Sequence, residues 1–343
     1  MLIHSLIASA ALLSVHVQDK PATASDEKAV SLARVMKPGE KLTYQVRSRL
    51  MVEERGQGLH TFMPSQLDLN YDFTTEVKAA KADGIVEMQY RRPTMTQIEG
   101  ETYDAPAKTK VEKTNLDFLL TLSPINEILS SKDTPKAAPK TPPKGKQPPK
   151  RGKGGWILES PASASAALQG GLLDQFKMEI YRLALFVGNL DTALDLAPKL
   201  PYEEVKPGDT WKRTASYTPQ KLKGKDGKMA MQRLDYTYTY RGIVESNGKK
   251  VHRITGELSM DNDILDFVLQ LVQMKKEDAG IKSIRLNFKS HIDFDLDLQT
   301  RRTLQAVASS DGGFAFVLTQ SPDDPLAEER IKGSTTLRLV SAK

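Results

Sequence analysis

Asp293, Asp295 and Asp297 recur at alternate positions of one segment and are the first candidates for metal chemistry. Clustered carboxylates suit a hard cation such as Ca²⁺. Alternate residues of an extended strand lie about 6.6 Å apart, so each carboxylate would need further oxygen ligands from elsewhere. The simpler interpretation is that all three are outward residues of a half-buried strand, balanced by cross-strand cations such as Arg301 or Arg302. We therefore predict no metal site here.

Signatures of catalysis and of cofactor binding are missing from the sequence. The chain has no cysteine, which excludes thiolate chemistry and disulfides. His60, His252 and His291 have no second histidine at ligand spacing. No G-x-S-x-G elbow, Walker loop or dinucleotide fingerprint occurs. We expect no cofactor and predict a non-catalytic protein; the alternative is an enzyme whose paired carboxylates meet only in the fold.

An aromatic row is the candidate for ligand binding. Tyr236, Tyr238 and Tyr240 share one face of a predicted strand, Trp211 follows a Pro-Gly-Asp turn, and Phe294 lies in a later strand. Such rings can line a ligand cavity, although filling a core is their more common role. Stacking on nucleic acid would require interleaved Lys or Arg. The intervening residues are instead Asp235, Thr237 and Thr239. Core filling is therefore the simpler interpretation, and these five aromatic residues are the candidates if the protein binds an apolar or amphiphilic ligand. We expect no nucleic acid.

One basic tract accounts for the net charge of +6. Residues 132–153 contain eight Lys and Arg against one Asp, a net of +7, which leaves −1 for the rest of the chain. The tract is rich in proline and has no apolar side chain larger than alanine, so it predicts a disordered, semi-stiff linker. The alternative is a tether to anionic envelope polymers or lipid head groups. Its cations would be Lys140, Lys144, Lys146, Lys150 and Arg151.

The N-terminal segment predicts export. Residues 2–17 form an apolar run that is too short and interrupted for a spanning helix, and it is typical of a signal peptide within residues 1–22. A buried N-terminal helix is the alternative. No later segment approaches the ~18 consecutive apolar residues of a membrane span. We expect a periplasmic or secreted protein.

The elements that must position these residues are mainly strands. Apolar residues recur with period two at 67, 69, 71 and 73, and again at the even positions from 284 to 298, where only Ser290 interrupts the row. A row without a phase slip predicts one long, continuous strand of a curved sheet. Amphipathic helices are expected over residues 172–187 and 264–276, the second capped by Asp261 or Asp263. Each helix would cover one face of a sheet.

Features recur in the same order in the two halves of the chain, which indicates a duplication. Lys37-Pro38-Gly39-Glu40 corresponds to Lys206-Pro207-Gly208-Asp209, and the turn at residues 83–84 to that at 247–248. The segments QLDLNYDFTTEV and FLLTLSPINEILSS likewise correspond to QRLDYTYTYRGIV and FDLDLQTRRTLQAV. We predict a first β-rich repeat over residues 30–131, the linker over 132–155, and a helix with the second repeat over 156–343.

The Pro-Gly-Asp-x-Trp entry, the Asn-Gly hairpin and the late F-x-L-x-L strand resemble an uncharacterised family of secreted bacterial β proteins. At fold level the long strands with a covering helix are similar to the half-barrels of periplasmic lipoprotein carriers. That resemblance implies a concave face that holds acyl chains, and it carries over no functional residue. We therefore expect an α+β fold, mainly antiparallel, with two tandem curved-sheet domains of half-barrel form, each covered by helix. Its expected role is non-catalytic binding of a lipid-like ligand or envelope partner, the alternative being a scaffold that adheres through the basic linker.

Overall fold

The computed structural model describes residues 28–100, 106–133, 173–217, 232–272 and 275–343. Within them the chain forms one antiparallel sheet of eleven long strands. In chain order the strands are β1 (Lys41–Gly56), β2 (Met63–Ala80), β3 (Val86–Glu99), β4 (Lys108–Leu122), β5 (Ile128–Asp133), β6 (Thr210–Tyr217), β7 (Gln232–Ser246), β8 (Lys249–Asp263), β9 (Ile281–Leu296), β10 (Thr303–Leu318) and β11 (Ala327–Ala342). The prediction of a mainly antiparallel β fold is confirmed.

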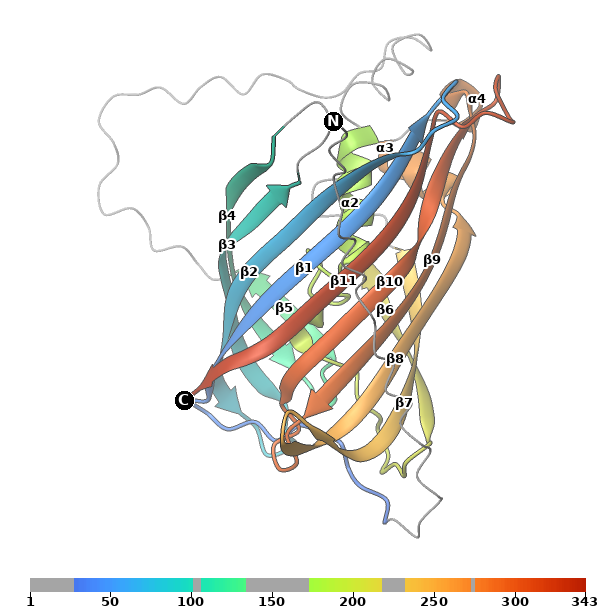
Figure 1. Cartoon of the computed structure of the whole chain (residues 1–343). Coiled ribbons are helices and arrows are strands. Elements are labelled where there is room, and N and C mark those ends of the chain that lie inside the picture. The colour runs from blue at the N-terminus through green and yellow to red at the C-terminus, as the bar shows by residue number, and fades with distance from the viewer. Residues whose placement is uncertain (1–27, 101–105, 134–172, 218–231, 273–274) are drawn as a thin grey trace, which may run out of the picture.

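The sheet is a meander whose first and last strands in the sequence lie side by side at its centre. Its strand order is β5-β4-β3-β2-β1-β11-β10-β9-β8-β7-β6, and β11 pairs with both β10 and β1. The strands expected for two half-barrels therefore belong to a single curved sheet (Figure 1). The two edge strands of the sheet are β5 and β6. They follow one another in the sequence but do not pair, so the meander is interrupted between them.

Strand β9 matches the predicted even-numbered apolar row. Inward residues alternate with exposed ones from Ile284 to Ile292, and Ser290 is buried with them. Asp295, which the pattern places on the outward side, is only 5% exposed. Alternation without a slip keeps one face of the strand on the core along its length. The strand ends because Asp297 begins a turn, in which its backbone N–H donates to the carbonyl of Arg302.

The two Lys-Pro-Gly turns make matching contacts with their own halves of the sheet, while the duplication itself stays a prediction. Gly39 and Gly208 both have positive φ, 85° and 96°, a conformation that favours glycine. The N–H of Gly39 donates to Val77 of β2, and the N–H of Gly208 donates to Tyr240 of β7, at 2.8 and 2.7 Å. Each turn thus fixes the first strand of its half to the second.

Helices are few. The helix α2 (Leu173–Ala184), expected over residues 172–187, lies against the concave side of the sheet, whereas α3 (Leu265–Val272) and α4 (Lys276–Ala279) lie near one end (Figure 1). The second predicted helix is thus shorter than expected, and a separate turn of helix follows it. Of its two candidate caps, Asp263 is the one that accepts the N–H of Leu265, at 3.0 Å.

Residues 30–36 cross the opposite end of the sheet, the lower end in Figure 1. Val30 pairs with Val205 before β6, and the N–H of Arg34 donates to Pro124 in the β4–β5 turn, at 2.8 Å. Leu32 between them is buried in the core. This segment therefore joins loops from both halves of the sheet.

Candidate functional site

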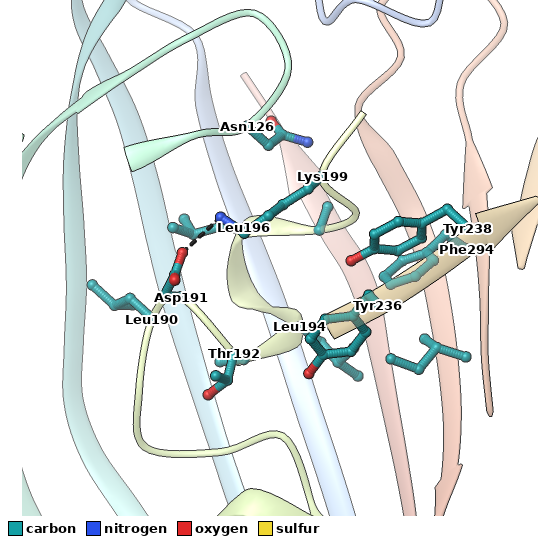
Figure 2. A pocket seen from close by; sticks show the side chains of 13 residues that line it. Asn126, Leu190, Asp191, Thr192, Leu194, Leu196, Lys199, Tyr236, Tyr238 and Phe294 are labelled. Atoms are coloured by element: carbon teal, nitrogen blue, oxygen red, sulfur yellow. Dashed lines mark hydrogen bonds and ion pairs between the residues drawn. The ribbon is translucent and has the colours of Figure 1, made fainter. Parts of the chain in front are cut away.

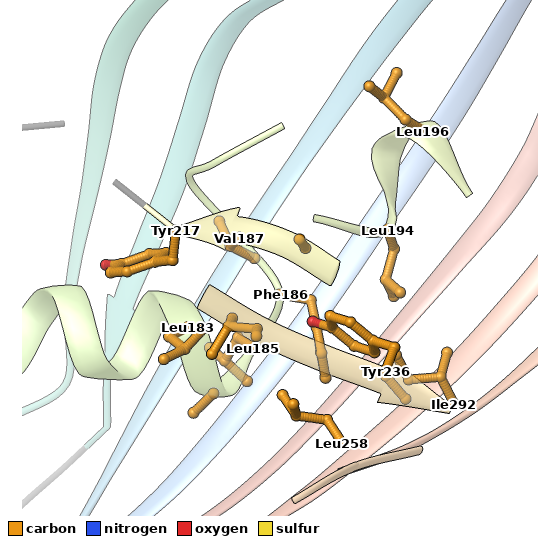
Figure 3. Packing of buried hydrophobic residues seen from close by; sticks show 14 of the residues in the cluster. Leu183, Leu185, Phe186, Val187, Leu194, Leu196, Tyr217, Tyr236, Leu258 and Ile292 are labelled. Atoms are coloured by element: carbon orange, nitrogen blue, oxygen red, sulfur yellow. The ribbon is translucent and has the colours of Figure 1, made fainter. Parts of the chain in front are cut away.

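The concave face of the sheet is filled by residues 173–200, which we call the inner segment. It comprises α2, the irregular residues 185–193, the short 3₁₀-helix η2 (Leu194–Leu196) and a final stretch to Leu200. Because β5 and β6 are opposite edges of one sheet, the chain between them must return across the molecule, and this segment lies on that path. Its apolar side chains pack against inward residues of the strands, as Figure 3 shows for Leu185, Phe186 and Leu194 beside Tyr236.

Polar contacts join the inner segment to both edges of the sheet. On the β5 side, the amide of Asn126 donates to the carbonyl of Pro198 at 2.8 Å. On the β6 side, the backbone N–H of Ser216 donates to the Asp191 carboxylate at 2.6 Å. The backbone carbonyl of Ser216 accepts a hydrogen bond from the side-chain amide of Asn189 at 3.1 Å. Edge strands present unpaired N–H and C=O groups, and the inner segment satisfies both groups of Ser216.

The C-terminal carbonyls of α2 rest on a row of small residues in the sheet. Ser310 donates to the carbonyl of Ala184 at 2.6 Å, and Thr335 donates to that of Leu185 at 2.9 Å. The last carbonyls of a helix have no partner within it, so the sheet supplies them. Gly333 permits this approach, since a Cβ there would lie 2.5 Å from the Ser310 hydroxyl and 3.0 Å from the Ala184 carbonyl oxygen.

Earlier in α2, Lys177 forms ion pairs with Glu54 of β1 and, at 3.0 Å, with Glu329 of β11. The hydroxyl of Tyr181 donates to Glu329 at 2.7 Å. Burial raises the pKa of the Glu329 carboxyl, an effect that Lys177 and Tyr181 oppose. The helix is therefore fixed to the two central strands by charged contacts as well as by apolar packing.

A buried carboxylate, Asp195 in η2, is the centre of a polar cluster in the interior. Tyr71 of β2 donates to its Oδ1 atom and Tyr90 of β3 to its Oδ2 atom, both at 2.6 Å. The guanidinium of Arg92, also on β3, lies 3.8 Å from the same carboxylate and 4.5 Å above the ring of Tyr71. Burial raises the pKa of Asp195, although Arg92 and the two hydroxyls favour its charged form. Burial also raises the pKa values of both tyrosines well above normal, so they are protonated donors at neutral pH.

The predicted aromatic row lies in the core, beside the inner segment. Tyr236, Tyr238 and Tyr240 are buried, and the ring of Tyr238 stacks on Trp211 at 5.6 Å and contacts Phe294 at 6.3 Å. Tyr236, Tyr238 and Phe294 border a cavity of about 20 Å³, whose other wall is formed by residues 190–199 (Figure 2). That volume admits about one water molecule. Because Tyr236 also stacks on Tyr238, the structure brings four of the five predicted residues together. The fifth, Tyr240, instead hydrogen-bonds through its hydroxyl to Nδ1 of His252, at 2.7 Å.

The aspartate row of β9 has structural partners, of which Arg302 was among those predicted. Asp295 pairs with Arg253, its cross-strand neighbour on β8, at 2.9 Å. Arg301 and Arg302 lie in the turn beyond the end of the strand and not across from it. Burial opposes ionisation of Asp297, but hydrogen bonds from Thr300 and Gln299 and the charge of Arg302 lower its pKa. Asp297 accepts the N–H of Thr300 at 2.8 Å within that turn. Among the described residues no group of three or more His, Cys, Asp or Glu could hold a metal ion.

The remaining expectations concern parts of the chain outside the described residues. They are the signal peptide over residues 1–22 and the basic tether of Lys140, Lys144, Lys146, Lys150 and Arg151. Both stay predictions. Within the described residues, no helix combines the length and hydropathy that crossing a membrane requires.

Sequence reasoning missed the cluster around Asp195, although one signal pointed to it. Val86, Met88, Tyr90 and Arg92 form an alternating row whose last member is a cation in the inward phase. A buried charge requires a partner, so the row predicts a carboxylate on the concave side. Spacing could not identify Asp195, which lies more than a hundred residues away in the sequence.

Comparison with known proteins assigns no family. No protein-family model matches the chain, and no curated protein matches it. Among solved structures, one that describes lipid–protein interactions in lipovitellin is 7% identical in sequence, with a TM-score of 0.39. The match covers 90% of this chain and 26% of the lipovitellin chain, so this chain spans about a quarter of the length of lipovitellin. DynF from the dynemicin biosynthesis pathway of Micromonospora chersina is 7% identical with a TM-score of 0.20, over 94% and 90% of the two chains. A putative outer membrane lipoprotein-sorting protein domain from Vibrio parahaemolyticus is 7% identical with a TM-score of 0.14, over 89% and 85%. Structural neighbours thus include a lipoprotein-sorting domain, but similarities this low carry no argument about function.

Proposed function

We propose that this chain is an exported, non-catalytic protein that binds an apolar or amphiphilic ligand on the concave face of its sheet. The observation that carries the proposal is how that face is covered. An apolar surface extends across a sheet of eleven strands, and within the described residues one helix and a largely irregular segment fill it, where a second sheet would otherwise pack.

Ligand binding on this face requires the inner segment to move. Pockets for small molecules measure about 300–1,000 Å³, whereas the cavity beside Tyr236 has a volume of about 20 Å³. Irregular backbone in a core depends on particular side chains to satisfy its N–H and C=O groups. Residues 185–200 depend in this way on Thr335 and Asn126, and Ser310 satisfies the preceding carbonyl, that of Ala184. A segment fixed at separate points can leave the sheet while the strand ladders stay intact.

The buried acidic groups described above support a non-catalytic role. Asp195 is enclosed by two tyrosines and an arginine, and Glu329 by a lysine and a tyrosine. A general acid or base must reach the proton that it transfers, and both carboxylates face protein groups within the core. They stabilise the position of the inner segment.

The absence of native cysteine allows a direct test with single thiols. Leu196→Cys places a thiol in the inner segment, and Leu42→Cys places one in β1; both native leucines are buried. The neutral fluorescent probe N-phenylnaphthylamine should bind the wild-type protein and accelerate maleimide labelling of Cys at position 196 several-fold. Labelling at position 42 is the matched control and should not change. Absence of probe binding, or binding with no change at position 196, would contradict the proposal.

A further inference from the structure

We infer that β2 and β3 form a binding site for the carboxylate head group of an anionic amphiphile, and that Asp195 of the inner segment occupies it in place of the ligand. This inference rests on the function proposed above and names the class of ligand. The site consists of Tyr71, Tyr90 and Arg92, all inward residues of the sheet.

The geometry is that of carboxylate recognition. The two tyrosine hydroxyls donate to different oxygens of one carboxylate, at 2.6 Å each. The Arg92 guanidinium, 3.8 Å from the carboxylate, adds positive charge on the same side. Hydrogen bonds to an ionised group are roughly twice as strong as those between neutral groups. Because all three side chains come from the sheet, the site persists when the inner segment leaves.

Arg92 shows why the occupant must be an anion. Its side chain is 3% exposed, and Asp195 is the carboxylate within 4.0 Å of it among the described residues. Its Nε atom has no hydrogen-bond partner there, so a donor remains to be satisfied. Burying an unpaired charge is strongly unfavourable. A neutral ligand that displaced Asp195 would leave the guanidinium unpaired, whereas a ligand carboxylate would replace the lost partner.

The surroundings select a carboxylate attached to an apolar chain. Leu69, Phe73 and Met88 are fully buried inward residues of the same two strands. In the inner segment, Leu194 and Leu196 lie on either side of Asp195, so the segment itself presents an acid between apolar groups. A long-chain fatty acid has the same combination of groups. Its head would reach Arg92 while its chain replaced the leucines against the sheet.

The test compares cis-parinaric acid with its methyl ester, which has the same chain and no charge. We expect the wild-type protein to prefer the acid by about tenfold or more, the size of an effect from a hydrogen-bonded charge. Asp195→Asn removes the competing carboxylate and should increase this preference further. Arg92→Met combined with Asp195→Leu replaces the buried pair by apolar groups, which preserves folding in many proteins, and should abolish the preference.

Arg91→Met is the matched control, because Arg91 is the neighbouring residue on the exposed face of β3 and pairs there with Asp117. It should keep the preference of the wild-type protein. Retained binding of N-phenylnaphthylamine establishes that each variant is folded. Equal affinity of the wild-type protein for acid and ester, or an unchanged preference in the Arg92→Met/Asp195→Leu variant, would overturn the carboxylate site and leave the proposed function standing. If neither parinaric probe nor N-phenylnaphthylamine binds, both proposals fail.

Discussion

Removing single hydroxyl groups from the Asp195 cluster measures how strongly the sheet holds the inner segment. In Tyr71→Phe and Tyr90→Phe, one hydrogen bond of 2.6 Å to a buried carboxylate is lost and the ring remains. Bonds to charged groups contribute ~1.5–3 kcal/mol, so each variant should lower the free energy of unfolding by about 2 kcal/mol. Tyr44→Phe is the matched control. Tyr44 is equally buried, and its hydroxyl donates to the neutral carbonyl of Thr303 at 3.1 Å, a bond that contributes ~0.5–1.5 kcal/mol.

Urea denaturation of these variants, alone and combined with Asp195→Asn, separates the effect of the charge from that of the ring. In Asp195→Asn the amide oxygen can accept from one tyrosine hydroxyl, and the amide N–H can donate to the other. Both bonds are then between neutral groups, so Tyr71→Phe should cost ~1 kcal/mol in this background. The cost of Tyr44→Phe should be the same in both backgrounds, because distant sites are additive. The reasoning is refuted if Tyr71→Phe and Tyr90→Phe cost no more than Tyr44→Phe, or if Asp195→Asn leaves their costs unchanged.

Three further predictions concern the rest of the fold. Gly333→Val should lower the free energy of unfolding in urea by ~1–3 kcal/mol, because even its Cβ would overlap the carbonyl end of α2; unchanged stability would show that this contact yields easily. By NMR titration, the pKa of His291 should lie above 6.5, since it hydrogen-bonds to Asp293, and that of His252 below 6.5, since it is buried. The contribution of His291 to stability should accordingly be lost as the pH rises through its folded-state pKa, and that of His252 as the pH falls from about 6.5 through its folded-state pKa. A pKa of His291 below 6.5 would contradict the first assignment, and a pKa of His252 above 6.5 the second. Asp263→Ala removes the acceptor for the Leu265 and Ile284 N–H groups and should lower the free energy of unfolding in urea by ~1 kcal/mol. The exposed neighbour Asn262 gives the control Asn262→Ala, which should change this free energy less; equal losses would count against the cap.

Periodicity predicted the elements that depend on local pattern. The even-numbered row of β9 and the amphipathic stripe of α2 were found because each repeats the geometry of its own backbone. The partners of those elements were not predictable in the same way. Strand β11 joins two halves that the sequence presents as separate. Its pairing with β1 brings together strands that lie far apart in the sequence and adjacent at the centre of the sheet.

The candidate site shows the same division. The three tyrosines of β7 were identified from one strand pattern, and the shared face that it assigns them is the buried one. The polar cluster draws Tyr71, Arg92 and Asp195 from three elements. The position of Arg92 on the inward face of β3 is the one feature of the sequence that indicates this cluster. Alternation with period two assigns each residue to a face of the sheet, but it does not identify the residue that it contacts.

The pairing of β1 with β11 also limits when the molecule can be completed. The register runs from Leu42 opposite Ala342 to Gly56 opposite Ala327, so the earliest strand obtains its second neighbour only from the latest one. During synthesis, one edge of β1 stays unpaired until β11 is available. Contacts so far apart in the sequence slow folding, and exposed edges favour association with other chains. A factor that shields this edge would act on the nascent chain and would have no binding surface on the finished protein.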